Sequence, residues 1–386
     1  MSDSPADGRL VRHMRQVLLW PVHLMPLDPA SGIASHAEAL QRDPGSHPWR
    51  EVDDEFGDPA SFQARHYNEF ITFLPPVQLF LYGQGLGRSV RRTYGESPIT
   101  VMRRTDIAKA RVTLAQGDAP VLLEIVHVDL YLYFDLDVAL LAVEVSASNL
   151  PYDLALETLF RFGRAYPAYW ETSGRGGHCP WRVEWVSADG SVIATSDYER
   201  REKYLSTVCQ HRAPAIAAHW EAMLAPLVIH HGDRPGAVRF RQLEYHRMPY
   251  MVYLAMEDAT ALTRSDLARI TLGNAPGESE TLPYAAHYLE DFEQRYCYDR
   301  YSEPGVPDRF GTRFLTTGHT LIVLGQASDP FFADADGGVL GRFRHQHFLL
   351  FMIAHFQKAA MRMFSDRLVG IVSRLEFYTP EELARI

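Results

Sequence analysis

The chain has 386 residues, a length that suggests two or three folding units. Of these residues 46% are hydrophobic and 22% are charged, which is the composition of a globular protein. A formal net charge of −10 argues against a general nucleic-acid binder, whose surface is normally basic. Cys179, Cys209 and Cys297 form no C-x-x-C pair, so a reducing compartment is expected rather than a disulfide framework.

The first half of the chain carries its clearest signals for β-structure. Val17–Leu24 predicts a first strand, and the Pro-, Gly-, Asp- and His-rich residues at about 25–60 predict an irregular segment. From Glu124 to Phe134 apolar residues alternate with more polar ones, which predicts a strand with one apolar face. Val138–Val145 is apolar on both faces and therefore predicts a central strand.

Helical signals follow these strands. Residues 152–160 repeat apolar positions at helical spacing, and Asn149 is the expected N-cap. Arg182–Val186 and Tyr250–Met256 predict further strands, and Thr263 predicts the cap of a short helix. Strands interleaved with helices indicate an α/β (α+β) fold, with a central mixed sheet covered by helices.

The C-terminal part predicts a long, stalk-like helix. After a strand expected at Leu315–Leu324, Phe343–Glu376 contains no proline and one glycine, which predicts a helix of about 34 residues or roughly 50 Å. Its first half is apolar almost all round and its second half carries one apolar stripe, so the helix should pack on the domain and then leave it. A helix-start signal at Thr379 has only seven residues after it, which suggests a truncated further helix and a chain that continues beyond Ile386. We therefore divide the sequence into an α/β domain, 1–340, and a helical part, 341–386.

No motif in the sequence is specific enough to name a catalytic or cofactor-binding residue. Asp334 and Asp336 lie in an acidic, glycine-bearing turn that lacks the EF-hand spacing, so an ordinary turn and a loosely bound hydrated divalent ion stay open. The neighbouring histidines His230 and His231 favour a polar loop over a metal site, because metal ligands usually come from i, i+4 helical pairs or alternating strand positions. The most apolar run, about ten residues at 347–356, is half the length of a spanning helix of about twenty.

Several stretches resemble the large cytosolic region of proteobacterial proteins classed as CorA-like magnesium transporters. The resemblance covers most of the chain and is strongest in RHYNEFITFLPPVQLFLYG (65–83), ETLFRFGRAYPAYW (157–170), EYHRMPYMVYLAMED (244–258) and HFLLFMIAHFQKAAMRMFSDRL (347–368). The family implies a cytosolic α/β domain and a stalk helix that leads to two membrane helices in a pentamer. The family's pore-side G-M-N signature does not occur in this sequence.

The resemblance therefore implies a regulatory or assembly domain on the cytoplasmic side of the inner membrane, joined to the membrane only through a further C-terminal part. It implies self-association as a pentamer and the binding of Mg²⁺ or another divalent cation between subunits. The metal-site candidates under this hypothesis are Asp334 and Asp336 in the acidic turn and Asp366 on the stalk.

Two other classes of function compete with this interpretation. One is an enzyme with a dispersed active site, for which His127, Asp129 and Tyr131 on the polar face of a strand are candidates. The other is a scaffold or interaction protein whose exposed helix binds a partner. An enzyme should have a deep pocket with convergent polar groups and perturbed titrating residues, whereas a transporter domain should have a protruding helix and no such pocket.

Overall fold

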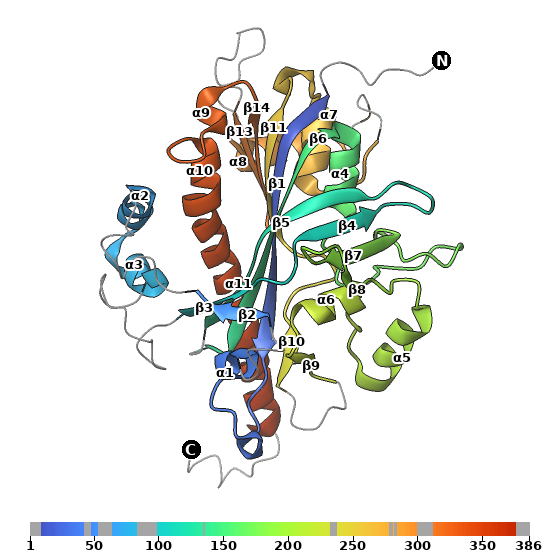
Figure 1. The fold of residues 1–386 in the computed structure, drawn as a ribbon, viewed down its shortest axis with the longest axis vertical. Helices are drawn as coiled ribbons and strands as arrows, with labels where there is room; N and C mark the ends of the chain where they lie inside the picture. The colour runs from blue at the N-terminus through green and yellow to red at the C-terminus, as the bar shows by residue number, and fades with distance from the viewer. Residues whose placement is uncertain are drawn as a thin grey trace.

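The computed structural model describes residues 9–41, 48–52, 64–82, 99–133, 136–231, 238–277, 281, 284–298 and 312–375. Over these residues the chain forms one mixed sheet of fourteen strands with helices on both faces (Figure 1). The expected fold class is therefore confirmed. The helix start predicted at Thr379 lies outside the described residues.

Three long antiparallel strands form the centre of the sheet. They are β1 (Leu10–Leu24), β6 (Val138–Pro151) and β5 (Val121–Tyr133), in that spatial order. Each residue from Val138 to Val145 on β6 is buried, which explains why this segment is apolar on both faces. On β5, Val128, Leu130 and Leu132 are fully buried on one face, as the alternation predicted.

The sheet continues on both sides of this centre. Beyond β1 come β11 (Tyr250–Met256), β14 (Thr320–Gln326), β13 (Arg313–Thr316) and β12 (Cys297–Tyr298). Beyond β5 come β4 (Lys109–Thr113), β7 (Arg182–Val186) and β8 (Val192–Thr195). Two short branches leave this path: β3 (Ile99–Arg104) joins β5 to β2 (Trp49–Glu51), and β10 (Arg239–Gln242) joins β1 to β9 (Val228–Ile229).

Helices cover both faces and so enclose two apolar cores. The larger core lies under α4 (Tyr152–Arg161), α6 (Ala218–Met223) and α7 (Arg264–Leu272). The smaller core lies under α3 (Pro75–Tyr82), α10 (Val339–Arg342) and α11 (Phe348–Leu375). The remaining helical segments are η1 (Pro29–Ser31), α1 (His36–Gln41), α2 (Ala64–Thr72), α5 (Arg201–His211), η4 (Ala259–Ala261), α8 (Ala286–Tyr296) and α9 (Pro330–Ala333).

The C-terminal helix is continuous over the described residues. α10 passes through a π turn at Phe343–His347, labelled η5, directly into α11, whose 28 residues span about 42 Å. Phe351, Met352 and Met363 are buried against the sheet. From Phe364 to Val372 every residue is exposed, so the apolar packing of the helix ends at Met363, although Asp366 and Arg367 still pair with Arg241 and Asp137. No helix in the described part of the chain combines the length and the apolar character that crossing a bilayer requires.

Three local predictions are wrong. Asn149 does not cap α4; it lies inside β6 in a left-handed conformation (φ 56°), and the cap position is taken by Pro151. Leu315–Leu324 is not one strand, because a turn at residues 317–319 separates β13 from β14. The segment at 25–60 is also less irregular than expected, since it contains α1 and β2.

Candidate functional site

A cavity of about 430 Å³ lies between the end of α5, the β9–β10 pair and the C-terminal half of α11. Its polar lining comes from segments far apart in the sequence. His211 is the last residue of α5 and Arg212 follows it, His230 follows β9, Arg241 lies on β10, and Arg362 lies on α11. Such a cavity has the size of a small-molecule site, for which about 300–1,000 Å³ is typical.

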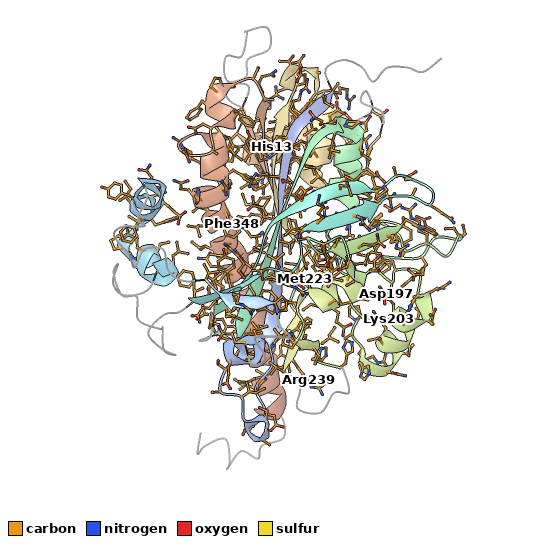
Figure 2. The ribbon with its side chains drawn as sticks, in the orientation of Figure 1. His13, Asp197, Lys203, Met223, Arg239 and Phe348 are labelled. Carbon is orange, nitrogen blue, oxygen red and sulfur yellow. The ribbon has the colours of Figure 1, made fainter. Side chains whose placement is uncertain are left out.

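The α5 side of the cavity is fixed by its helix end and by one buried carboxylate. Arg212 adopts a left-handed conformation (φ 55°) and donates its N–H to the carbonyl of Val208, which ends α5. Asp197 accepts hydrogen bonds from the Lys203 ammonium (2.7 Å) and from the backbone N–H of Ala218 (2.8 Å). Figure 2 labels Asp197 and Lys203 close together beside α5. This carboxylate therefore ties α5 to the start of α6.

The opposite wall is built around Glu244, which is buried although it carries a carboxylate. Its two oxygens accept from the Lys358 ammonium and from the Arg362 guanidinium, each at 2.9 Å. Burial alone would raise the pKa of Glu244, but Lys358 and Arg362 outweigh it and leave the pKa lowered. Glu244 is thus ionised, and its charge is already balanced by α11.

Positive charge dominates the lining. Three arginines, Arg212, Arg241 and Arg362, face one acid, Glu244. The pKa of His230 is lowered by burial and then by the neighbouring charges of Arg241, His211 and Arg239. Figure 2 labels Arg239 at this end of the molecule. The cavity therefore has the electrostatic character of an anion site rather than of a cation site.

The metal-site candidates from the sequence do not come together within one chain. Asp334 accepts from the backbone N–H groups of Asp336 (2.9 Å) and Gly337 (3.2 Å), which makes it a turn-forming residue. Asp366 lies roughly 40 Å further along the helix and pairs with Arg241 at 2.6 Å. Among the residues that the structure describes, no group of three His, Cys, Asp or Glu side chains could hold a metal ion.

The residues of the dispersed-enzyme hypothesis are engaged in contacts within the fold. His127 lies 3.1 Å from Glu144, which also binds Arg15 at 2.5 Å. The carboxylate of Asp129 accepts both ends of the Arg103 guanidinium at 2.7 and 2.8 Å. Tyr131 packs against Phe348 of α11 (ring centroids 5.9 Å apart), and burial raises the pKa of its hydroxyl. These three residues act here as sheet-face residues and do not line the cavity described above.

Comparison with known proteins adds no identification of this site. No protein-family model matches the chain, and no curated protein or solved structure matches it. The site is therefore described by its own residues. Sequence reasoning noted His230 but missed Arg212, Arg241 and Arg362, because more than a hundred positions separate Arg241 from Arg362 and no local motif joins the three.

Proposed function

We propose that this chain is the cytosolic assembly and regulatory part of a CorA-like divalent-cation transport protein. The observation that supports the proposal best is the surface of α11 beyond the core. Met361, Phe364, Leu368 and Ile371 are 66%, 51%, 61% and 56% exposed and follow one another at intervals of three or four residues. This spacing is that of the apolar seam through which helices pair in coiled coils.

The α11 seam, defined as Met361, Phe364, Leu368 and Ile371, is contiguous. Apolar side chains scattered singly over a surface are ordinary, whereas a contiguous set on one helix marks an interaction site. Further apolar residues, Val369 and Val372, are also exposed on these turns. A second copy of the chain offers the same apolar surface, so copies could pack together through this helix, and the resemblance implies such self-association.

Ion pairs hold these turns in a defined position. Arg241 pairs with Asp366, and Arg367 pairs with Asp137 at 2.9 Å, so two body residues fix the helix just where the apolar core ends. A helix that is already ordered loses less conformational entropy when a partner packs against it. This arrangement suits an assembly element.

The test is sedimentation equilibrium of the chain with and without about 5 mM Mg²⁺, a concentration at which weak carboxylate sites are occupied. We expect self-association that Mg²⁺ strengthens, and we expect Leu368→Glu to abolish it because a charge would enter the apolar seam. The matched control is Leu205→Glu on α5, the same change at an exposed leucine away from the seam. Equal effects of both variants, or a wild-type monomer at every concentration and Mg²⁺ level, would contradict the proposal.

A second candidate function, a scaffold that binds a different protein, rests on the same exposed seam. The two functions differ in whether the chain associates with itself through the seam. A chain that stays monomeric at every Mg²⁺ concentration would favour the scaffold, because its seam would then be left for a different protein.

A further inference from the structure

We propose that the cavity between α5, β10 and α11 binds a small organic phosphate, held by arginines at one end and by aromatic rings along its walls. Three arginines and one glutamate line it in a chain whose formal net charge is −10. An acidic protein that gathers cations around a concave surface concentrates anions there. This proposal does not depend on the transport function.

Arg212 is the first of the phosphate-binding groups. It is exposed at the rim, and within the described part of the chain its side chain makes no hydrogen bond or ion pair. Its backbone is held by the left-handed turn that ends α5. The guanidinium is therefore positioned at the cavity while its donors remain available for a ligand.

Arg241 and Arg362 complete the set from the opposite side. Arg362 uses one nitrogen, Nη1, to donate to the Leu243 carbonyl (2.5 Å) and to Glu244 (2.9 Å), which orients the rest of the guanidinium. Arg241 pairs with Asp366, but that carboxylate is more than half exposed, so a ligand can displace it at small cost. Guanidinium groups bind phosphate oxygens in paired, charge-assisted hydrogen bonds, which favours a phosphate ligand.

The rest of the lining favours a ligand larger than phosphate itself. Tyr166, His211 and Tyr245 line the cavity, the Arg362 guanidinium lies over the Tyr245 ring (5.1 Å to its centroid), and the volume of about 430 Å³ leaves room beyond one phosphate group. The His211 ring is also stacked on His231 (centroids 5.3 Å apart, planes 18° apart), which holds it in place. Flat ring walls next to arginines suit a phosphate attached to a planar base, as in a nucleoside monophosphate.

A ligand bound in this cavity would affect α11 through Arg241 and Arg362. A phosphate that takes Arg241 from Asp366 removes one of the two ion pairs that hold the end of the helix, and leaves Arg367–Asp137 in place. The ligand would therefore loosen the position of the α11 seam without unfolding it. Because Arg362 lies on α11 itself, the helix is also part of the binding site.

The test is isothermal titration of the whole chain with AMP, adenosine and inorganic phosphate. We expect AMP to bind with a Kd below about 1 mM, phosphate to bind more weakly, and adenosine to give no heat. Arg212→Gln and Arg241→Gln should each weaken AMP binding by about tenfold, the loss expected for one charge-assisted hydrogen bond. The matched control, Arg12→Gln, removes another exposed, ion-paired arginine, on β1 far from the cavity, and should leave the Kd unchanged.

A second variant tests the cavity itself. Ala213→Trp places a large ring in the lining and should abolish AMP binding while the melting temperature stays near that of the wild type. The proposal is overturned if AMP gives no heat at about 10 mM, or if Arg12→Gln weakens binding as much as Arg241→Gln. Equal affinity for adenosine and AMP would show that the arginines do not bind the phosphate group. Equal affinity for phosphate and AMP would show that the aromatic rings do not bind the base.

Discussion

The guanidinium of Arg241 on β10 lies 2.6 Å from the carboxylate of Asp366 on α11, 125 positions further along the chain. This pair joins the sheet to the helix at the point where the apolar core ends. Arg241 also lines the basic cavity. One arginine thus connects the cavity to the helix whose exposed seam we assign to assembly.

The Arg241–Asp366 pair should help to fix the position of α11 but should add little to the free energy of unfolding. Both side chains are more than one third exposed, and pairs of this kind contribute about 0.2–1 kcal/mol. We expect a double-mutant cycle with Arg241→Gln and Asp366→Asn, measured by urea denaturation, to give a coupling in that range that decreases in 0.5 M salt. A coupling of about 3 kcal/mol would show that the pair is buried in solution.

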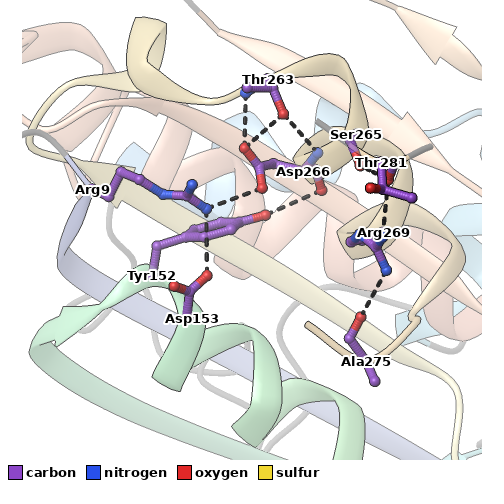
Figure 3. Close-up of polar contacts among 9 residues, drawn as sticks. All are labelled: Arg9, Tyr152, Asp153, Thr263, Ser265, Asp266, Arg269, Ala275 and Thr281. Atoms are coloured by element: carbon purple, nitrogen blue, oxygen red, sulfur yellow. Dashed lines mark hydrogen bonds and ion pairs between the residues drawn. The ribbon is translucent and has the colours of Figure 1, made fainter. Parts of the chain in front are cut away.

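Asp266 is a second charged residue that joins distant elements, and it is almost fully buried. Its carboxylate accepts from the Thr263 backbone N–H (2.9 Å), the Thr263 hydroxyl (2.8 Å) and Arg9 (3.0 Å), which precedes β1, as Figure 3 shows. We expect Asp266→Ala to destabilise the protein by about 3 kcal/mol, since it leaves these donors without their acceptor. Thr263→Ala removes a hydroxyl that donates to the Asp266 carboxylate and accepts from the Asp266 N–H, and it should cost about 1 kcal/mol.

The control for this cluster is Asp153, which also pairs with Arg9 but at 3.3 Å and with a side chain that is 71% exposed. Asp153→Ala should change the free energy of unfolding by no more than about 0.5 kcal/mol. Urea denaturation of the three variants gives the comparison. Similar losses for Asp153→Ala and Asp266→Ala would show that burial does not govern this cluster.

His219 should make the protein less stable as the pH falls. The ring is fully buried among Trp185, Tyr198 and Trp220, and burial lowers its pKa to about 3. In the unfolded chain this histidine binds a proton near pH 6.5, whereas in the folded chain it stays neutral. The contribution of His219 to the free energy of unfolding is therefore complete above pH 6.5 and is lost as the pH falls towards 3.

His219→Phe should therefore reduce the pH dependence of stability. Neither ring nitrogen of His219 has a hydrogen-bond partner among the described residues, so the variant leaves no donor or acceptor unpaired. From pH 6.5 to 5 the wild type should lose about 2 kcal/mol more than the variant, at about 1.4 kcal/mol per pH unit. Denaturation curves at pH 7.5, 6.5 and 5 measure the difference. Parallel losses in both proteins would refute the assignment.

Sequence patterns predicted the elements whose causes are local. β7 and β11 begin and end where the periodicity placed them, and Thr263 caps α7 as predicted. The β13–β14 hairpin was missed because its turn lies inside a run of apolar and β-branched residues. Asn149 was misassigned because β6 continues past its apolar part and Asn149 binds Arg12 there at 3.2 Å.

The cavity could not be predicted in this way. Arg212, Arg241 and Arg362 meet only because β10 pairs with β1 and α11 packs across the sheet, and both contacts link residues far apart in the chain. The α11 seam, in contrast, was visible as a stripe at helical spacing. Its exposure, however, depends on where the sheet ends, which only the three-dimensional arrangement shows.

The last prediction concerns Mg²⁺ and the carboxylates that the resemblance suggested. Two carboxylates from neighbouring subunits about 4 Å apart near a surface repel by about 4 kcal/mol, and by less in salt. An ion that binds only the assembled form stabilises it by about 1.4 kcal/mol per site at tenfold excess over its Kd. Because each repelling pair holds its own ion, this gain offsets the repulsion only where salt has reduced the repulsion of a pair to about 1.4 kcal/mol.

Asp366 is the candidate with the clearest test, because Arg241 already balances its charge. Arg241→Gln should free the carboxylate and increase the rise in sedimentation-average mass that Mg²⁺ produces, whereas Asp366→Asn should abolish that rise. Asp336→Asn, in the turn at the other end of the α10–α11 helix, tests the second site separately. Association that rises equally with Mg²⁺ in all three variants and in the wild type would exclude both aspartates as metal ligands and leave general charge screening as the cause.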